Sequence, residues 1–339
     1  ERINTSELDV KNYISTENML QNFQGISIAN SIPDNINVTS FKEGDILISN
    51  IRPYLTKVWQ SDRKGGCSAD VFVLKANNTI CSDCFLHYLI ANDTFINFVM
   101  SGAKGVKMPR GDKKQMVTYN MGIPHIKEQN KISRLLDLLN KRIVTQNKII
   151  EVLKKLKVAI RDKAIALGIK KSVFKTLDSI ADIYQPQTIP TSLLSEDAEY
   201  FVYGANGVIG KYTEYNHSEP QICIACRGNT CGAINFSIAK SWITGNAMVV
   251  NTDQYSVINK RYLYHYLSTI NFNPLISGSG QPQIVRQPLA KLKIPIPSIE
   301  QQVGIVKVID SFELKIEIEN KYLQSLSTQK VYLLSNMFI

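Results

Sequence analysis

Cysteines are the most reactive side chains in this sequence, and two pairs of them have a spacing that can bind metal ions. Two residues separate Cys81 from Cys84, and two separate Cys223 from Cys226. Four thiolates from two such pairs could hold a tetrahedral zinc ion. However, residues 222–226 have the pattern of a β-strand, in which side chains three positions apart point to opposite faces. We therefore interpret the cysteines as small buried thiols of a reducing compartment and predict no metal site.

Residues suited to enzymatic chemistry are scarce in the rest of the chain. The sequence has no phosphate-binding loop ending in Gly-Lys-Ser/Thr, no His-Glu-x-x-His pair and no nucleophile elbow. Gly204, Gly207 and Gly210 partly match a dinucleotide-binding fingerprint, but their spacing differs and a strand continues past them. They predict a hairpin turn instead. We therefore predict that the chain is not an enzyme.

Long polar side chains beside glycine-rich turns are better supported as functional residues. Arginine can read guanine in the major groove of DNA, glutamine or asparagine can read adenine, and lysine can contact phosphate. The candidates in the first half of the chain are Arg52, Lys57, Lys104, Lys107, Arg110, Lys113 and Lys114. Those in the second half are Asn206, Lys211, Arg227, Asn229, Thr230, Gln281, Gln283 and Arg286. The alternative for each is an ordinary solvated loop residue.

A long helix must position these loops. From residue 128 to about 167 the apolar residues recur at helical spacing without proline, with the heptad seam of a coiled coil. A shift of 173 positions aligns Pro124 with Pro297, Gln129 with Gln302 and the first seam with a second one. The chain is therefore a duplicated unit, in which a globular piece is followed by a long helix. The predicted seam residues are Leu136, Leu139, Ile143, Ile150, Leu153, Ile309, Phe312, Ile316, Leu323 and Leu326.

The globular pieces contain mixed elements in the same order. Short apolar strands precede an amphipathic helix over residues 84–100 in the first piece and 259–270 in the second, and an exposed loop follows each helix. The predicted segments are 1–127, 128–171, 172–299 and 300–339. The fold class is thus α/β, or α+β, with two repeated globular domains joined by a long antiparallel two-helix coiled coil.

Length and charge agree with this division. A chain of 339 residues is long enough for two domains, and no apolar run approaches the length of a membrane span. Residues 128–171 hold twelve Lys or Arg and four Asp or Glu, which is +8 of the net charge of +10. Such a basic segment can bind a polyanion, and it can equally be a solvated helix face.

Five segments resemble the specificity subunits of type I restriction-modification systems. They are GDILISNIRPYLTKV (44–58), KGVKMPRGDKK (104–114), YGANGVIGKY (203–212), SGSGQPQIVR (277–286) and IPIPSIEQQ (294–302). The resemblance covers nearly the whole chain. It implies two target-recognition domains that each read half of a split, asymmetric site in double-stranded DNA, and helices that set the half-site spacing.

The resemblance also implies partners and a location. The helices would dock methyltransferase subunits, and a restriction subunit with translocase activity would complete the restriction form. S-adenosylmethionine and ATP would bind to those partners and not to this chain, in the cytoplasm. Members of the family have a further strand and loop, matching residues 180–187, before the point where this sequence begins, so we expect a trimmed start. The alternative function is a coiled-coil scaffold that joins protein partners without binding DNA.

Overall fold

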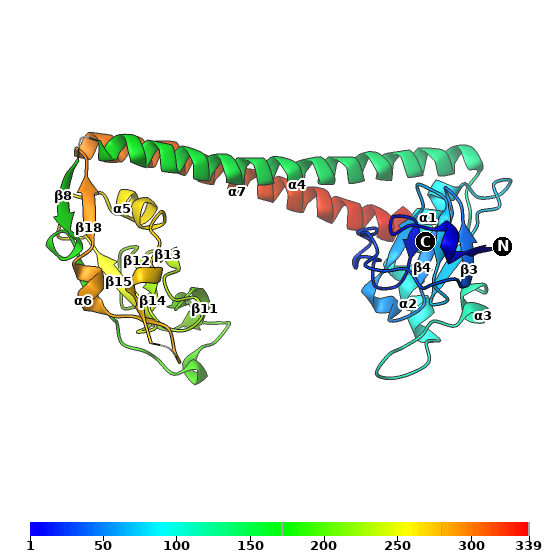
Figure 1. The fold of residues 1–339 in the computed structure, drawn as a ribbon, viewed down its shortest axis with the longest axis horizontal. Helices are drawn as coiled ribbons and strands as arrows, with labels where there is room; N and C mark the ends of the chain where they lie inside the picture. Colours follow the sequence, from blue (N-terminus) through cyan, green and yellow to red (C-terminus); the bar gives the residue numbers. More distant parts are fainter. Residues whose placement is uncertain (171, 279, 338–339) are drawn as a thin grey trace. The chain divides into compact units, whose positions relative to one another are not determined.

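The computed structural model describes residues 1–170, 172–278 and 280–337, and it divides them into two compact units (Figure 1). Unit 1 runs from Glu1 to Lys148 and resumes at Asn320, and unit 2 comprises Ile149–Glu319. Each unit therefore contains a globular part and about half of each long helix. The predicted segment boundaries remain predictions, and residues 171 and 338–339, which end the two predicted helical segments, lie outside the described residues.

Unit 1 has two sheets. One has the order β1-β3-β6-β2 and the other the order β5-β4-β7. Helices α1 and α2 pack with the second sheet and the start of α4 in one apolar core. The bounds are β1 Arg2–Asn4, β2 Tyr13–Ile14, β3 Asn37–Phe41, β4 Ile46–Ser49, β5 Val58–Gln60, β6 Gly65–Cys67, β7 Val71–Leu74, α1 Asp83–Ile90, α2 Asp93–Ser101 and α3 Lys113–Met116.

Unit 2 repeats this plan with additional pairings. Its sheets have the orders β13-β12-β15-β9 and β11-β10-β14, and there are two pairs, β18-β8 and β16-β17. The bounds are β8 Val173–Thr176, β9 Asp182–Tyr184, β10 Tyr200–Gly204, β11 Gly207–Tyr212, β12 Ile222–Ala225, β13 Ile234–Phe236, β14 Trp242–Ile243, β15 Ala247–Asn251, α5 Lys260–Leu267, β16 Ile276–Ser277, β17 Gln283–Ile284, α6 Arg286–Ala290 and β18 Lys293–Ile296. Hairpin β10–β11 confirms the turn predicted from the glycines.

The duplication extends from the helices into the sheets. In unit 1 Leu47 of β4 pairs with Val73 of β7, and in unit 2 Cys223 of β12 pairs with Val249 of β15. Each residue of the pair in unit 2 lies 176 positions after its counterpart in unit 1, whereas equivalent residues of the two long helices are 173 positions apart. The same strand pairing thus recurs in the two units, as the repeated element order predicted.

The first predicted amphipathic helix is in fact two helices, α1 and α2. The break lies at Asn92, whose side-chain Oδ1 accepts a hydrogen bond from the Thr94 amide at 2.9 Å and so caps α2. Its Nδ2 donates to the carbonyl of Leu334 at 2.9 Å. An asparagine at this position competes with the helical hydrogen bonds and starts a new helix, which the apolar spacing alone did not indicate.

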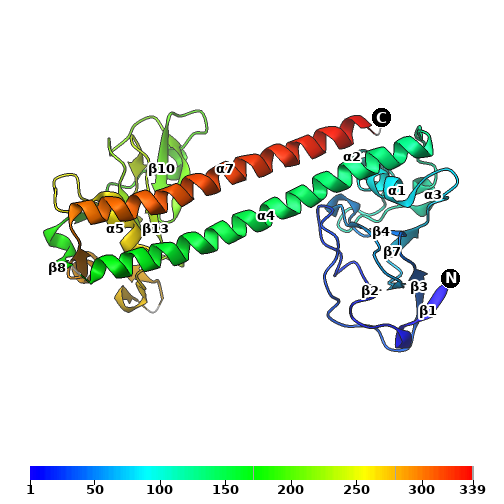
Figure 2. The same ribbon diagram turned by 90° about the horizontal axis from the view of Figure 1, so that it is seen from above.

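The long helices are α4, Ile126–Ile169, and α7, Ile299–Met337. Within unit 1, Arg142 donates to the Tyr322 hydroxyl at 3.2 Å, and within unit 2, Lys157 lies 3.2 Å from the Glu313 carboxylate. The partner's number falls as the number on α4 rises, so the helices are antiparallel (Figure 2). All ten predicted seam residues are buried or half-buried, while Leu138 and Val152, outside the seam, are more than half exposed.

A buried glutamine joins each long helix to its globular part. Gln129 accepts from the Ser82 amide at 2.9 Å and donates to the carbonyls of Ile80 at 2.7 Å and Pro124 at 2.8 Å. Its counterpart in unit 2 is Gln302. That side chain accepts from the amide of Asn259 at 2.7 Å and donates to the carbonyls of Val257 at 3.1 Å and Pro297 at 2.9 Å. Both glutamines are fully buried, so each amide satisfies backbone groups that water cannot reach.

A carboxylate at the equivalent position of the two units adds a second contact between helix and globular part. In unit 1 the Tyr88 hydroxyl donates to Asp137 at 2.6 Å. In unit 2, Asp310 takes this position and accepts from Arg261 at 2.7 Å, with the His265 ring nitrogen 3.0 Å away. Burial lowers the pKa of His265, so Arg261 supplies the positive charge near neutral pH.

The cysteines are all free thiols. Cys223 and Cys226 belong to different apolar clusters, in agreement with their predicted positions on opposite faces. Burial raises the pKa of Cys223 to about 12. Cys84 and Cys231 are only half-buried, contrary to the prediction of buried thiols throughout.

Within the described ranges no group of three or more metal-ligating side chains is placed to hold an ion. No described helix is long and apolar enough to span a membrane.

Replacing the buried glutamine by a smaller side chain should cause a large loss of stability. Gln302→Ala should lower the free energy of unfolding by about 3 kcal/mol, because buried backbone groups near Asn259 lose their partners. Urea denaturation followed by circular dichroism measures the loss. The control is Gln324→Ala at an exposed helical position, which should change the free energy by less than about 0.5 kcal/mol. Equal effects of the two substitutions would contradict a special role for Gln302.

Candidate nucleic-acid interface

The two units each place a short hairpin at the same point of the fold. Hairpin 1 comprises residues 104–110, and its ends meet where the amides of Lys104 and Arg110 each donate to the other's carbonyl at 2.9 Å. Hairpin 2 comprises residues 277–283, and Ser277 pairs there with Gln283. Residue 279 of hairpin 2 lies outside the described residues. The paired residues are 173 positions apart, so the hairpins are equivalent.

Each hairpin requires a glycine after its first residue. Gly105 has φ +95° and Gly278 has φ +94°, a backbone conformation that side chains disfavour. A Cβ at Gly278 would lie 2.6 Å from the carbonyl oxygen of Gln281, and one at Gly105 would lie 3.2 Å from that of Met108. The tight turn therefore depends on glycine in both units.

Both hairpins dock on the end of a central strand through the same two backbone bonds. In unit 1, Gly111 donates to the Asn50 carbonyl at 3.0 Å and Arg52 donates to the Pro109 carbonyl at 2.8 Å. In unit 2, the equivalent donors are the amides of Ile284, to Cys226, and Gly228, to Pro282, both at 3.0 Å. We call each hairpin with its docking turn, residues 50–52 or 226–228, a hairpin platform.

The docking turns use left-handed backbone. Gly228 adopts φ +79° without strain, but its counterpart Arg52 adopts φ +50°. An arginine in this region is strained by about 1 to 2 kcal/mol. Its Nε is buried and has no hydrogen-bond partner within the part of the chain that the structure describes. Strained and unpartnered polar groups of this kind cluster at functional sites.

In unit 1 most of the predicted DNA-contacting residues lie on or beside the platform. Lys104 lies 3.2 Å from Asp112, and Arg110 lies 3.3 Å from Asp70. A backbone hydrogen bond at Lys114 and the Lys104 ammonium hold the pKa of Asp112 below its usual value. Lys107 is exposed within the hairpin, and Lys113 and Lys114 begin helix α3 just after it. Lys57 instead donates to the Thr16 carbonyl at 2.5 Å.

In unit 2 the platform contains Arg227, whose backbone pairs with Gln283, and the exposed Gln281. Asn229 and Thr230 directly follow its docking turn. Arg286 follows the hairpin, but its Nε donates to the Ile183 carbonyl of strand β9 at 2.8 Å. The two remaining candidates belong to hairpin β10–β11. Asn206 there accepts from the Asn235 side chain at 3.1 Å, and the Lys211 ammonium lies 5.7 Å from the centre of the Phe201 ring.

The platforms share a backbone but differ in charge. Residues 104–114 contain five Lys or Arg and one acidic residue, Asp112. The equivalent residues 277–287 contain Arg286 as their only charged residue, together with three glutamines. Residues 104–114 are therefore suited to bind a polyanion, and residues 277–287 to form neutral hydrogen bonds with base edges, while each docking turn adds one arginine, Arg52 or Arg227.

Sequence reasoning missed the acidic partners Asp70 and Asp112 and the polar residue Asn50, whose side-chain oxygen is buried without a partner in the described ranges. It also missed the left-handed residue Gly228. The equivalence of the two hairpins could have been found from the sequence, because the 173-position shift aligns Gly105 with Gly278 within the two loops. Nothing in the sequence indicated that either hairpin pairs with its docking turn, since the residues that bond to each other are more than 50 positions apart.

A family model for the type I restriction modification DNA specificity domain matches this chain twice, at residues 4–155 and 169–328. The two matches together span most of the chain. The chain belongs to this specificity family. The repeat inferred from the helices is therefore a repeat of the family's domain, and each copy contains one hairpin platform.

Individual members of the specificity family show the same likeness. The chain is 25% identical over 310 residues to the type I restriction enzyme MjaVIII specificity subunit of Methanocaldococcus jannaschii, covering 79% of this chain and 72% of that protein. It is 31% identical over 142 residues to a protein of Haemophilus influenzae assigned as a type I specificity subunit, but that match covers 41% of this chain and only 36% of the relative.

A solved structure supports the fold. The crystal structure of the type I restriction-modification S subunit from M. genitalium matches with a TM-score of 0.63 and 16% identity, over 100% of this chain and 96% of that one. At this identity the likeness concerns the fold, and it agrees with the predicted repeated α/β domains and antiparallel helices.

Glycine at the start of hairpin 2 can be tested directly. Gly278→Ala places a Cβ against the Gln281 carbonyl and should destabilise the closed hairpin by about 1.4 kcal/mol, which is a tenfold change in opening. Hydrogen exchange at the backbone amides of Ser277, Gln283 and Ile284 should rise accordingly. Gly280→Ala is the matched control, because among the residues that the structure describes no atom beyond its chain neighbours lies within 4 Å of its Cβ position. Similar exchange in both variants would contradict the proposed need for glycine.

Proposed function

We propose that the chain is the DNA-reading subunit of a type I restriction-modification complex, in which each unit binds one half of a bipartite, asymmetric site. The observation that carries this proposal is the hairpin platform, built twice with the same backbone bonds and with different side chains. A repeated frame with variable side chains suits a protein that must recognise two different short sequences.

The side chains of the platforms favour different kinds of contact. Lys104, Lys107 and Arg110 in hairpin 1 supply positive charge for phosphates, and arginine can also bind guanine through two hydrogen bonds. Gln281 and Gln283 in hairpin 2, with Asn229 in the adjoining segment, carry the amides that bind adenine through two hydrogen bonds. Unit 1 should therefore contribute most of the salt-dependent affinity, and unit 2 should contribute mainly base discrimination.

The helices supply the second half of the proposed function. Helices α4 and α7 set the spacing between the half-sites, and they dock the methyltransferase subunits. Support for docking comes from exposed apolar residues at heptad-like spacing on α4, namely Leu135 and Leu138 in unit 1 and Ile149, Val152 and Leu156 in unit 2. Such a stripe suits the face of another helix.

The partners carry out the chemistry in this proposal. The chain itself binds and positions DNA, S-adenosylmethionine belongs to the methyltransferase subunits, and ATP belongs to the restriction subunit that translocates DNA. The rival function is a scaffold that joins protein partners through the same helices without contacting DNA. The charge of platform 1 favours the DNA-reading function, because a scaffold needs no cluster of cations on a loop beside a strained turn.

Salt dependence separates the two functions. Lys107→Gln with Lys114→Gln should weaken binding to duplex DNA and reduce the slope of log affinity against log salt by about 2, since each lost phosphate contact removes about 0.9. The measurement is fluorescence anisotropy with the assembled methyltransferase complex at several salt concentrations. Lys11→Gln, at an exposed position of unit 1 that belongs neither to the platform nor to helix α3, is the control. An unchanged slope and affinity in the double variant would favour the scaffold.

Exchange of one unit tests half-site reading. Replacing residues 172–299 by the matching part of a relative should change one half of the methylated sequence and leave the other half unchanged. In the same assay, Gln281→Ala with Gln283→Ala should relax base preference within that half only, by about 1–3 kcal/mol for each lost bidentate contact. Sequencing of methylated positions in cells that produce the complex reports both results. A change in both halves would contradict independent reading.

A further inference from the structure

The part of helix α7 that belongs to unit 1 carries a lysine whose counterpart in unit 2 forms an ion pair. The 173-position shift aligns Lys330 with Lys157 and Asn140 with Glu313. In unit 2 the Lys157 ammonium lies 3.2 Å from the Glu313 carboxylate. In unit 1 the position of this carboxylate is held by the amide of Asn140, which has no charge to balance the ammonium. The duplication thus keeps the cation and replaces its anion.

No other carboxylate of the described structure takes over the place of Glu313 beside Lys330. Lys330 is half-buried, and burial alone lowers its pKa, whereas a carboxylate close by would oppose that change. Asn140 donates instead to the Tyr88 hydroxyl at 2.9 Å. An ammonium that is partly removed from water without an anion beside it is unfavourable, so Lys330 has unused capacity to bind one.

The second cation of this cluster is also specific to unit 2. There Arg261 of α5 binds the Glu313 carboxylate at 2.7 Å. The two buried glutamines accept from the amides of Ser82 and Asn259, which aligns α1 with α5 at these residues. Two positions further along each helix, unit 1 has Cys84 where unit 2 has Arg261. Unit 1 therefore has neither the carboxylate nor the long guanidinium of the cluster.

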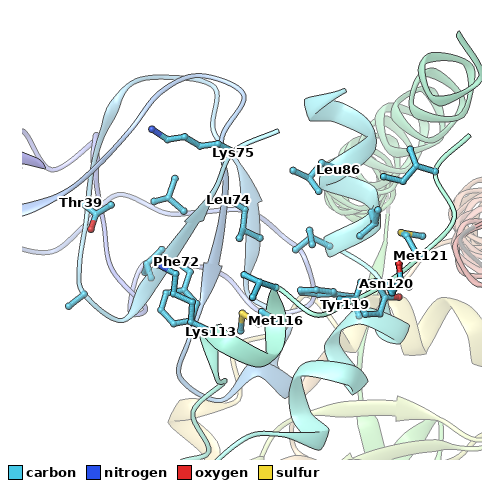
Figure 3. A pocket seen from close by; sticks show the side chains of 18 residues that line it. Thr39, Phe72, Leu74, Lys75, Leu86, Lys113, Met116, Tyr119, Asn120 and Met121 are labelled. Atoms are coloured by element: carbon cyan, nitrogen blue, oxygen red, sulfur yellow. The ribbon is translucent and has the colours of Figure 1, made fainter. Parts of the chain in front are cut away.

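Two cavities of unit 1 differ in their lining. One, of about 660 Å³, lies along β7 and is mainly apolar, with Leu74, Met116 and Tyr119 in its wall (Figure 3). The other has a volume of about 620 Å³ and lies between α1, α4 and α7, beside residues 22–24. Lys330 lines this second cavity. Volumes of this order accommodate small organic ligands.

The other ionisable side chains of the second cavity leave Lys330 as its cation. Burial lowers the pKa of His87 to about 4, so this ring is neutral near pH 7. Asp93 also belongs to the lining, but its side chain is exposed. Uncharged hydrogen-bonding side chains and apolar side chains share the remaining wall, among them Gln24, Asn147, Phe23, Ile143 and Leu334.

We propose that this second cavity of unit 1 binds a small organic carboxylate. Its anionic group lies beside Lys330 as Glu313 lies beside Lys157 in unit 2, and its apolar part packs against Phe23, Ile143 and Leu334. The ligand completes an ion pair that unit 2 makes within its own chain. The cavity shares no residue with the hairpin platforms, so this proposal does not depend on DNA reading.

A matched pair of probes tests the charge requirement. The full chain at neutral pH is titrated with para-fluorobenzoate, and binding is followed by fluorine NMR. The carboxylate should bind saturably and at least tenfold more tightly than para-fluorobenzamide, which has the same ring but no charge. Absence of binding, or equal binding of the two probes, would overturn the proposal.

Removal of the cation gives a second readout. Lys330→Met should lower the affinity for para-fluorobenzoate at least tenfold. It should also raise the midpoint of thermal unfolding by about 2 °C, because an unpaired, half-buried charge is replaced by an apolar side chain of similar length. Lys141→Met, at an exposed position of α4 in the same unit, should leave the affinity unchanged. A lower unfolding midpoint in Lys330→Met, or an unchanged affinity, would show that the lysine is structural.

Obstruction of the opening locates the site. Ser327 lines the cavity and is exposed, so Ser327→Trp should fill its mouth and lower the affinity at least tenfold without unfolding the chain. The control is Ser325→Trp, at an exposed position of the same helix that does not line this cavity. Equal affinities in the two tryptophan variants would place the ligand elsewhere and overturn the assignment.

An acidic side chain of a partner subunit is the competing source of the carboxylate. In that case the assembled methyltransferase complex would not bind para-fluorobenzoate, and Lys330→Met would weaken assembly at least tenfold. That result would overturn the proposal of a small ligand. Binding of the probe by the assembled complex, with assembly unchanged in Lys330→Met, would support it.

Discussion

A single buried amide at the first turn of each long helix joins that helix to the globular part of its unit. Gln129 and Gln302 each accept one backbone N–H and donate to two backbone carbonyls, and the three groups come from the helix entrance and from the residues before α1 or α5. An amide is the side chain that can do both, because it carries a donor and an acceptor on one planar group. It fixes the globular part on its own half of the helices, and the nearby carboxylate of Asp137 or Asp310 adds a second constraint.

This fixed frame explains how the hairpin platforms can vary in side chains without losing their shape. The bonds that dock each hairpin are between backbone groups, so they are insensitive to the change from Arg110 to Gln283 or from Met108 to Gln281. Only the glycine with positive φ is needed in both. The docking turns differ in this respect, because Arg52 occupies the left-handed position at which unit 2 has Gly228. Unit 1 therefore has a long cationic side chain at this turn despite the unfavourable backbone conformation.

The two units differ most in how their strand edges end. In unit 2 residues 173–184 pair with the edges of β15 and β18 and bury three aliphatic residues, Leu177, Ile180 and Ile183. In unit 1 the same surfaces surround an apolar groove. Strand edges and apolar side chains are both unfavourable in water, so residues 173–184 stabilise unit 2.

The sequence by itself determined the architecture. Heptad spacing predicted the two long helices, and the 173-position shift predicted the repeat and paired Gln129 with Gln302 before any contact was known. These features are local or periodic, and periodicity survives in a linear sequence. The apolar pattern did not predict the break between α1 and α2, because that pattern is continuous across the break and the capping by Asn92 competes with it.

Tertiary structure decided which of the candidate residues share a site. It placed Arg110 and Gln283 on docked hairpins, while it turned Lys57 toward Thr16 and Arg286 toward the carbonyl of Ile183. A cationic side chain that faces solvent and one that binds a backbone carbonyl elsewhere in the chain can have the same residue type and the same kind of loop position. The difference lies in contacts between segments far apart in the chain, such as residues 50–52 with 109–111, and the spacing of residues along a sequence carries no record of them.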